Sequence, residues 1–210
     1  MPKFEEWQTH ITMAYSDFSM YQLETQFGLQ ERRGVLFDKS ALQPVVVSDR
    51  LRDDLADANL LPINSEKSKS EHLITPILRE VWRMSGRQFT YYSGYSFNVD
   101  AAQGLVGVCD YLFSRENSFD VKSPVFCLVE AKNRTIEEGI AQAFAEMVAA
   151  RIFNARYGQP TPRIVGCVTN AFDWLFLELD GQTATIDTTR YFIDEQTLPV
   201  LLAALLEIVK

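Results

Sequence analysis

An apolar run that ends in opposite charges, VFCLVEAKNRT at residues 125–135, constrains the fold more than any other part of the sequence. Its first five residues are apolar at every position, which is typical of a strand covered on both faces. Glu130 and Lys132 follow two positions apart, so in an extended chain they lie about 7 Å apart on one face. Further back, the same face carries Phe126 and Leu128. The chain must therefore build a covered sheet that delivers a carboxylate and an ammonium together at one strand end.

Helical and strand-like patterns alternate around this strand. Pro76 fits the helix that surrounds it only in the first turn, and a capping-box pattern from Thr135 to Glu138 opens another helix that closes at Gly158. The predicted strands lie at 88–100, 104–114, 124–132, 163–170, 174–180 and 183–187, and the predicted helices at 71–84, 135–158 and 197–210. This order predicts an α/β fold with a mixed central sheet flanked by helices.

The N-terminal third has a different character. Residues 1–65 are predicted as a mostly helical extension, with one helix that ends near Gly28 and another that is capped by Ser48. The polar stretch NSEKSKSE then marks the best candidate boundary. Residues 66–210 are accordingly expected to form the main domain.

The net charge of −8 and the pI near 4.8 argue against a strong nonspecific binder of polyanions. The charge is unevenly distributed, however, because residues 66–163 carry 12 basic and 11 acidic side chains while both flanks are acidic. A local phosphate-binding surface is therefore compatible with the middle of the chain. The candidate phosphate contacts are Arg79, Arg83, Arg87, Arg134 and Arg151.

The three cysteines, Cys109, Cys127 and Cys167, are isolated in apolar runs, which is typical of reduced core thiols in a cytoplasmic protein. The chain starts with acidic residues rather than a signal peptide, and its longest apolar run is too short to span a bilayer. His10 and His72 are too few and too far apart to suggest zinc. We expect a cytoplasmic protein without a membrane role.

A second carboxylate is expected beside Glu130. Asp110 continues the face of Val106 and Val108 at the end of the preceding strand, and pairing of the two strands would bring it next to Glu130. Asp120, in the intervening loop, is a competitor for the same place. Neighbouring carboxylates repel unless a positive group lies between them, and Mg²⁺ or Mn²⁺ is the simplest candidate.

The spacing of these residues carries a resemblance. Asp110, nineteen intervening residues and then Glu130-Ala131-Lys132 resemble the signature of the PD-(D/E)XK, or restriction-endonuclease-like, nuclease superfamily. The resemblance covers about residues 66–180 and implies a core ordered α-β-β-β-α-β. It implies that Asp110 and Glu130 bind the catalytic metal and that Lys132 assists phosphodiester hydrolysis, either as a base or by stabilising charge. The proline that usually precedes the aspartate is absent, since Cys109 stands there.

Further site residues follow from the same resemblance. The superfamily often places a glutamate on its first core helix, where this chain offers Glu71, which we prefer, and Glu80. Gln142 is similar to a glutamine that some members carry on the helix after the third strand, and Glu146 lies one turn further along. The carbonyl of Ala131 is a further metal ligand on this view.

A narrower resemblance extends over most of the chain. It is to a group of bacterial proteins, common in cyanobacteria, that are assigned to this superfamily. It is carried by the segments EKSKSEHLITPIL, VGVCDYLFS, VEAKN, GIAQAFAEMVAA and GCVTNAFDWLFLEL. This resemblance implies a fold and a site but names no substrate.

We therefore expect a Mg²⁺- or Mn²⁺-dependent enzyme that hydrolyses phosphodiester bonds of nucleic acid, with DNA favoured over RNA. The alternative is a nuclease-like module without catalysis that binds protein or nucleic acid. A homodimer is a further expectation, because superfamily enzymes that cut both strands often work as dimers. The helix at 135–158 is apolar almost all round, so it lies either in the core or in a dimer contact.

Overall fold

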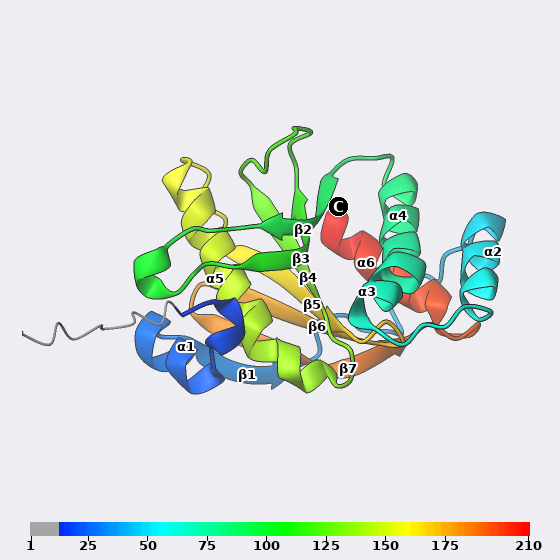
Figure 1. Ribbon diagram of the computed structural model, residues 1–210, viewed down its shortest axis with the longest axis horizontal. Helices are drawn as coiled ribbons and strands as arrows, with labels where there is room; N and C mark the ends of the chain where they lie inside the picture. Colours follow the sequence, from blue (N-terminus) through cyan, green and yellow to red (C-terminus); the bar gives the residue numbers. More distant parts are fainter. Residues whose placement is uncertain (1–12) are drawn as a thin grey trace, which may run out of the picture.

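The computed structural model describes residues 13–210, which form an α/β fold around one seven-stranded mixed sheet (Figure 1). The strands are β1 Gln30–Gly34, β2 Thr90–Ser96, β3 Val108–Ser114, β4 Val125–Ala131, β5 Arg163–Thr169, β6 Asp173–Asp180 and β7 Thr183–Phe192. The helices are α1 Met20–Phe27, α2 Asp49–Ala58, α3 Glu66–Lys69, α4 Thr75–Met84, α5 Ile140–Arg156 and α6 Leu198–Val209. The expected mixed sheet flanked by helices is confirmed.

The sheet order is β1-β7-β6-β5-β4-β3-β2. β2, β3 and β4 form an antiparallel meander, and α5 then crosses over so that β5 pairs parallel to β4. β5, β6 and β7 pair antiparallel, and β1 closes the far edge parallel to β7. β2 and β1 therefore lie at opposite edges of the sheet.

Two hydrophobic clusters cover the two faces of the sheet. One contains the buried sides of α2, α4 and α6, and Figure 1 shows α4 and α6 beside one another. The other contains α5 with the segment that includes α1. Residues 143–150 of α5 are all buried, and this helix packs on β4 and β5. The apolar character of α5 is therefore explained by the core.

Residues 66–84 form one continuous helical run. A π-helical segment, Ser70–Ile74, joins α3 to α4, and the N–H of Thr75 donates to the carbonyl of Ser70. Pro76 stands in the first turn of α4, as predicted, but helical turns precede it. Because proline has no N–H and crowds the carbonyl four residues back, a widened turn in front of it is the expected accommodation.

Local details depart from the sequence prediction. The side chain of Thr135 makes no capping hydrogen bond; it precedes a 3-10 turn, Ile136–Gly139, and the α-helix begins only at Ile140. Phe126 lies where the β3–β4 register shifts, and its ring packs against Phe89 on the opposite layer from Leu128. The prediction that Phe126 shares the face of Glu130 is therefore wrong.

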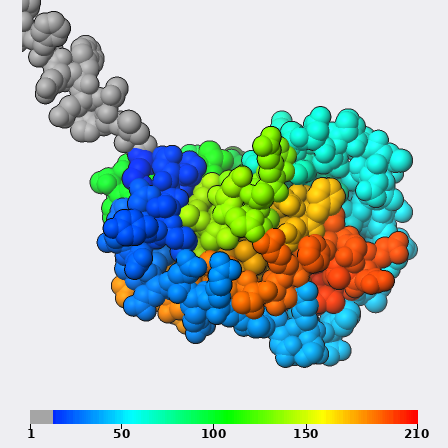
Figure 2. Space-filling view, turned by 90° about the horizontal axis from the view of Figure 1, so that it is seen from below, coloured from blue at the N-terminus to red at the C-terminus, as the bar shows by residue number. Residues whose placement is uncertain are grey.

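The segment before the main predicted domain contributes to both clusters. Residues 13–65 contain α1 and α2, capped by Ser48 as predicted, and also β1, which was not predicted. Leu23 lies in the cluster beside α5, and Leu51 in the cluster beside α4. Figure 2 shows the earlier part of this segment, in blue, spread over the lower part of that view. The helix predicted to end near Gly28 is α1, and the part of that prediction before Met13 lies outside the described residues.

Within residues 13–210, no helix combines the length and the apolar character needed to cross a bilayer.

Candidate active site

Asp110 and Glu130 meet at the ends of two neighbouring strands. β3 and β4 are antiparallel, and their last paired residues at this end are Tyr111 and Val129, so Asp110 stands opposite Glu130 in register. Opposite residues of an antiparallel pair project from the same face. Here Asp110 Oδ2 accepts the N–H of Ala131 at 2.8 Å, so a side chain continues the link between the strands. The structure thus brings together the two carboxylates that strand pairing was expected to join.

Lys132 connects this strand end to helix α5. Its Nζ donates to Glu130 Oε1 at 2.6 Å and to Gln142 Oε1 at 2.9 Å. Gln142 Nε2 in turn donates to Glu146 Oε1 at 3.2 Å, which is possible because residues four apart share one side of a helix. Glu130, Lys132, Gln142 and Glu146 therefore form one chain of contacts from β4 to α5.

The hydrogen bonds just described leave some buried carboxylate oxygens without a partner in the described part of the chain. Glu130 is 2% exposed and Glu146 is fully buried, and Oε2 of each has no hydrogen-bond partner in the described part of the chain. Burial raises the pKa of Glu130 most, and the charges of Glu146 and Asp110 raise it further. Lys132 offsets only part of this increase. Burial likewise raises the pKa of Glu146 and of Asp110, so the cluster binds protons or cations readily.

The electrostatics of Lys132 differ from those of its neighbours. Burial by itself would lower the pKa of Lys132, but the charge and hydrogen bond of Glu130, with Glu66 and Asp110 further off, raise it overall. Lys132 is therefore a cation at neutral pH. A protonated lysine can donate hydrogen bonds and stabilise negative charge, but it cannot accept a proton.

Glu71 and Asp110 line the same cavity, whose volume is about 310 Å³. Glu71 projects from the π-helical segment, is exposed, and lies 3.8 Å from Lys67 Nζ. The cavity is completed by Glu66, Lys67, Ser70, Thr75, Ser93, Gly94 and Tyr111. Glu71 of the helical run and Asp110 of β3 thus border one opening, whereas Glu130 does not line it.

The two competing carboxylates lie elsewhere. Glu80 is buried, accepts the N–H of Ser48 at 3.2 Å and lies 4.0 Å from Arg83, so it holds the start of α2 against α4. Asp120 is exposed in the loop at the opposite end of the β3–β4 hairpin. The structure therefore places Glu71, rather than Glu80, at the cavity of Asp110.

Tyr111 is a site residue that the sequence analysis missed. Its hydroxyl donates to the carbonyl of Ser70 at 3.0 Å and lies 2.9 Å from Thr75 Oγ1. These two residues bracket the turn that carries Glu71, so the strand residue next to Asp110 holds that turn in place. The sequence signal was only a tyrosine after the aspartate, because its partners lie about forty positions away.

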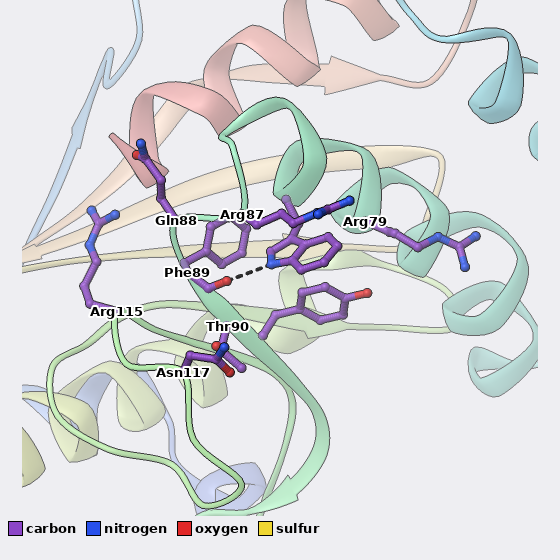
Figure 3. A pocket seen from close by; sticks show the side chains of 9 residues that line it. Arg79, Arg87, Gln88, Phe89, Thr90, Arg115 and Asn117 are labelled. Atoms are coloured by element: carbon purple, nitrogen blue, oxygen red, sulfur yellow. Dashed lines mark hydrogen bonds between the residues drawn. The ribbon is translucent and has the colours of Figure 1, made fainter.

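Two of the predicted phosphate contacts gather in a separate cavity. Arg79 and Arg87 line a pocket of about 410 Å³, together with Arg115, which was not predicted. Figure 3 shows Arg79 and Arg115 on opposite sides of this pocket, on α4 and on the segment after β3.

The other three arginines are not in this pocket. Arg83 lies beside Glu80, and Arg151 donates to the carbonyl of Gly181 in the turn between β6 and β7. Arg134 follows Lys132 by two residues, and its carbonyl accepts a hydrogen bond from Asn170 Nδ2 at 3.1 Å. Only Arg134 of these three is close to the carboxylate cluster along the chain.

The strand ends offer carboxylate oxygens, which are the type of ligand that Mg²⁺ and Mn²⁺ prefer. The buried Oε2 atoms of Glu130 and Glu146 lack hydrogen-bond partners, and Asp110 adds a third carboxylate nearby. As they stand, no three His, Cys, Asp or Glu side chains of residues 13–210 are grouped as a complete metal site. Mg²⁺ commonly takes one or two carboxylates and completes its shell with water and substrate phosphate. Ala131, the last residue of β4, could add its carbonyl to such a shell.

Comparison with known proteins does not assign this chain to a family. No protein-family model matches the sequence, and no curated protein matches it significantly.

Proposed function

We propose that this protein is a Mg²⁺- or Mn²⁺-dependent nuclease with a restriction-endonuclease-like core, and that DNA is its favoured substrate. The observation that carries the proposal is the joint position of Asp110, Glu130 and Lys132 at one end of the β3–β4 hairpin, with Gln142 contributed by the next helix. The element order supports it, because the helical run 66–84 is followed by β2, β3, β4, α5 and β5. This is the order that the PD-(D/E)XK resemblance implies.

In this proposal, Asp110 and Glu130 hold the ion, Glu71 borders the cavity that Asp110 lines, and the carbonyl of Ala131 completes the protein ligands. The ion, when bound, would polarise a phosphate oxygen and lower the pKa of the attacking water. Asp110 is held in position by the N–H of Ala131. The partly buried setting strengthens its interaction with a cation relative to an exposed carboxylate.

Lys132 would stabilise the charge that develops on the phosphate. Glu130 and Gln142 accept two of its three N–H donors, so the ammonium is held in position with one donor left for a phosphate oxygen. Glu146 accepts from Gln142 and keeps that amide oriented with its oxygen toward Lys132. Gln142 and Glu146 are thus positioning residues in this proposal.

The test is cleavage of supercoiled plasmid, single strands, branched DNA and RNA in the presence of Mg²⁺ or Mn²⁺. Lys132→Ala and Asp110→Asn should each reduce the cleavage rate by about 10²-fold or more, as removal of preorganised charge stabilisation does elsewhere. Lys122→Ala is the matched control, because Lys122 is exposed at the other end of the same hairpin. This control should cut at the wild-type rate.

Wild-type cleavage by Lys132→Ala would remove the proposed mechanism. Absence of cleavage by the wild-type chain in every condition would instead favour the non-catalytic binding module. Calorimetric titration with Mn²⁺ then adds a separate readout, in which Glu130→Gln should weaken binding. Light scattering of the same samples tests the predicted homodimer.

A further inference from the structure

The pocket lined by Arg79, Arg87, Arg115, Trp82 and Tyr91, here called the arginine pocket, is chemically unlike the rest of the molecule. Gln88, Phe89, Thr90 and Asn117 complete its lining, so none of its nine residues is acidic, although the chain has 28 acidic and 20 basic side chains. Its volume of about 410 Å³ lies in the range of small-ligand sites. An anion with an aromatic part fits this combination of guanidinium groups and rings.

The guanidinium groups are poorly compensated by the protein itself. Within the described residues, Arg87 and Arg115 have no carboxylate partner. Arg115 is fixed by donating to the carbonyl of Val209 at 2.6 Å, and its guanidinium lies 4.1 Å from the centre of the Phe126 ring. Arg79 bonds Asp54 at 3.2 Å, but its buried Nε has no partner among the residues that the structure describes. Donors are thus held in place for an anion that the protein does not provide.

The backbone at Arg87 is strained at the end of the helical run that lines the pocket. Arg87 has φ of +63°, in the left-handed region that non-glycine residues rarely adopt, directly after Gly86 at the end of α4. Its N–H donates to the carbonyl of Trp82, and its guanidinium lies 5.3 Å from the centre of the Trp82 ring. Trp82 is fixed by donating to the carbonyl of Phe89, the contact dashed in Figure 3. Strained residues of this kind are concentrated at binding sites.

The arginine pocket and the cavity of Asp110 lie along one seam between the helical run 66–84 and edge strand β2. The helix contributes Thr75 to the cavity and Arg79 to the pocket, four residues or about 6 Å apart. β2 contributes Ser93 to the cavity and Tyr91 to the pocket, about 7 Å apart. The two cavities are therefore close enough to hold neighbouring nucleotides of one strand, since even stacked bases are about 3.4 Å apart and an unstacked strand is more extended.

We propose that the arginine pocket binds a nucleotide of a single nucleic-acid strand next to the bond held at Asp110, and that Arg87 and Arg115, which lie on opposite sides of the pocket, contact phosphate groups of that strand. The inference rests on the proposed nuclease function for its choice of ligand. A concave pocket with aromatic walls accepts an unstacked nucleotide better than the regular backbone of a duplex. The substrate is thus single-stranded at this position, as at an end, a flap or a branch.

The test is binding of a fluorescently labelled single-stranded oligonucleotide, measured by anisotropy in EDTA so that no strand is cut. Arg87→Gly combined with Arg115→Gln should weaken binding about tenfold or more, because the variant cannot form the charge-assisted hydrogen bonds to phosphate. The slope of log affinity against log salt should fall by about 0.7 for each phosphate that the variant no longer neutralises. Arg32→Gln is the matched control, since Arg32 is exposed on β1 at the opposite sheet edge, and it should bind like the wild type.

The single variant Arg87→Gly distinguishes lost binding from a loss of folding. Arg115 contacts the C-terminal helix, so its substitution can disturb the fold, whereas glycine suits the positive φ at position 87. Arg87→Gly should therefore weaken binding severalfold without lowering the melting temperature. Wild-type affinity in this variant, or an equal reduction in Arg32→Gln, would overturn the inference.

Competition identifies the ligand class. A mononucleotide should displace the oligonucleotide at lower concentration than inorganic phosphate, and polyglutamate should displace it poorly. Equal competition by phosphate or by polyglutamate would overturn the assignment to a nucleotide. The binding assays contain no metal, so they are independent of the cleavage assays. A wild-type chain that binds the oligonucleotide but never cuts with Mg²⁺ or Mn²⁺ would contradict only the nuclease proposal. Arginine variants that cut and bind like the wild type would contradict only this inference.

Discussion

At the scale of single residues, the carboxyl groups of Glu130 and Glu146 carry the largest electrostatic cost. Each has one buried oxygen without a partner among the described residues, and one ammonium, Lys132, serves the cluster. A folded protein tolerates such groups by holding a proton or a cation. A divalent ion bound to these carboxylates would offset the free-energy cost of burying them, and this favours binding of the ion.

Stability should therefore fall as pH rises. The pKa of Glu146 is raised in the folded state, mainly by burial, above its unfolded value of about 4.3. The folded state then binds more protons than the unfolded state, so its stability decreases from about pH 4.3 upward through neutrality. The decrease is at most about 1.4 kcal/mol per pH unit for each such group. Chemical unfolding in EDTA at several pH values between about 5 and 8 measures the slope.

Glu146→Gln should flatten this pH dependence, because the amide keeps the oxygen that accepts from Gln142 but cannot ionise. Glu195→Gln, at an exposed position, is the control and should leave the slope unchanged. The difference between variant and wild type is the useful quantity, since paired surface carboxylates contribute slopes of the opposite sign at acid pH. Identical slopes for all three chains would contradict the burial argument.

The sequence predicted these residues to different degrees. Asp110, Glu130 and Lys132 follow from strand alternation and pairing, which are local and regular. Tyr111 and Arg115 were not predicted, because their roles depend on contacts with residues about forty and more than ninety positions away. No local pattern encodes such contacts.

At the scale of elements, the 3-10 turn Ile136–Gly139 is the part that brings α5 close to Lys132. A Cβ at Gly139 would lie 2.7 Å from Val168 Cγ1 and 3.0 Å from Lys132 Cε. Both approaches are shorter than ordinary contacts. Glycine here lets the lysine stem pass between the turn and the sheet.

Gly139→Ala should therefore displace Lys132 and overpack the turn, at a cost of about 1–3 kcal/mol in the free energy of unfolding. Urea unfolding measures this cost, and the cleavage rate should fall with it. Gly34→Ala is the control, because a Cβ there meets Thr185 at an ordinary 3.7 Å. In a double-mutant cycle, Lys132→Ala should relieve part of the cost of Gly139→Ala. Strict additivity would show that the two residues do not interact.

Most elements were predictable because their apolar periodicity is strong, as in β4, β5 and α6. β1 was not predicted, because its residues, QERRG, are mostly exposed and show no alternation. This edge strand is defined by its parallel pairing with β7 rather than by its own side chains. The 3-10 turn before α5 was missed for a related reason: the capping-box residues are present, but packing against β5 determines where the α-helix begins.

At the scale of the whole molecule, the charge distribution supports one orientation of a polyanion. The net negative charge comes from the two flanks of the sequence, whereas the arginine pocket and Lys132 belong to the nearly neutral middle. A strand would meet favourable charge at the arginine pocket, whereas Glu66, Glu71 and Asp110 in the neighbouring cavity would repel it unless a cation is bound there. The net charge of −8 does not reveal this local basic pocket.

The N-terminal segment contributes to the sheet and to both hydrophobic clusters, so its removal should destabilise the fold. Residues 13–65 supply β1 to the sheet and apolar side chains to both clusters, and Tyr15 donates from a buried position to the carbonyl of Phe97 at 2.6 Å. A chain of residues 66–210 would expose these surfaces and the edge of β7.

We therefore expect the 66–210 chain to unfold without cooperativity and to aggregate, whereas the full chain should unfold in one transition. Far-ultraviolet circular dichroism and tryptophan fluorescence should give coincident thermal curves for the full chain only, with light scattering as the measure of aggregation. A truncated chain that melts cooperatively at the full-length temperature would make residues 1–65 a separable extension. The carboxylate cluster could then be studied without it, because Asp110, Glu130 and Lys132 all lie in the part that remains.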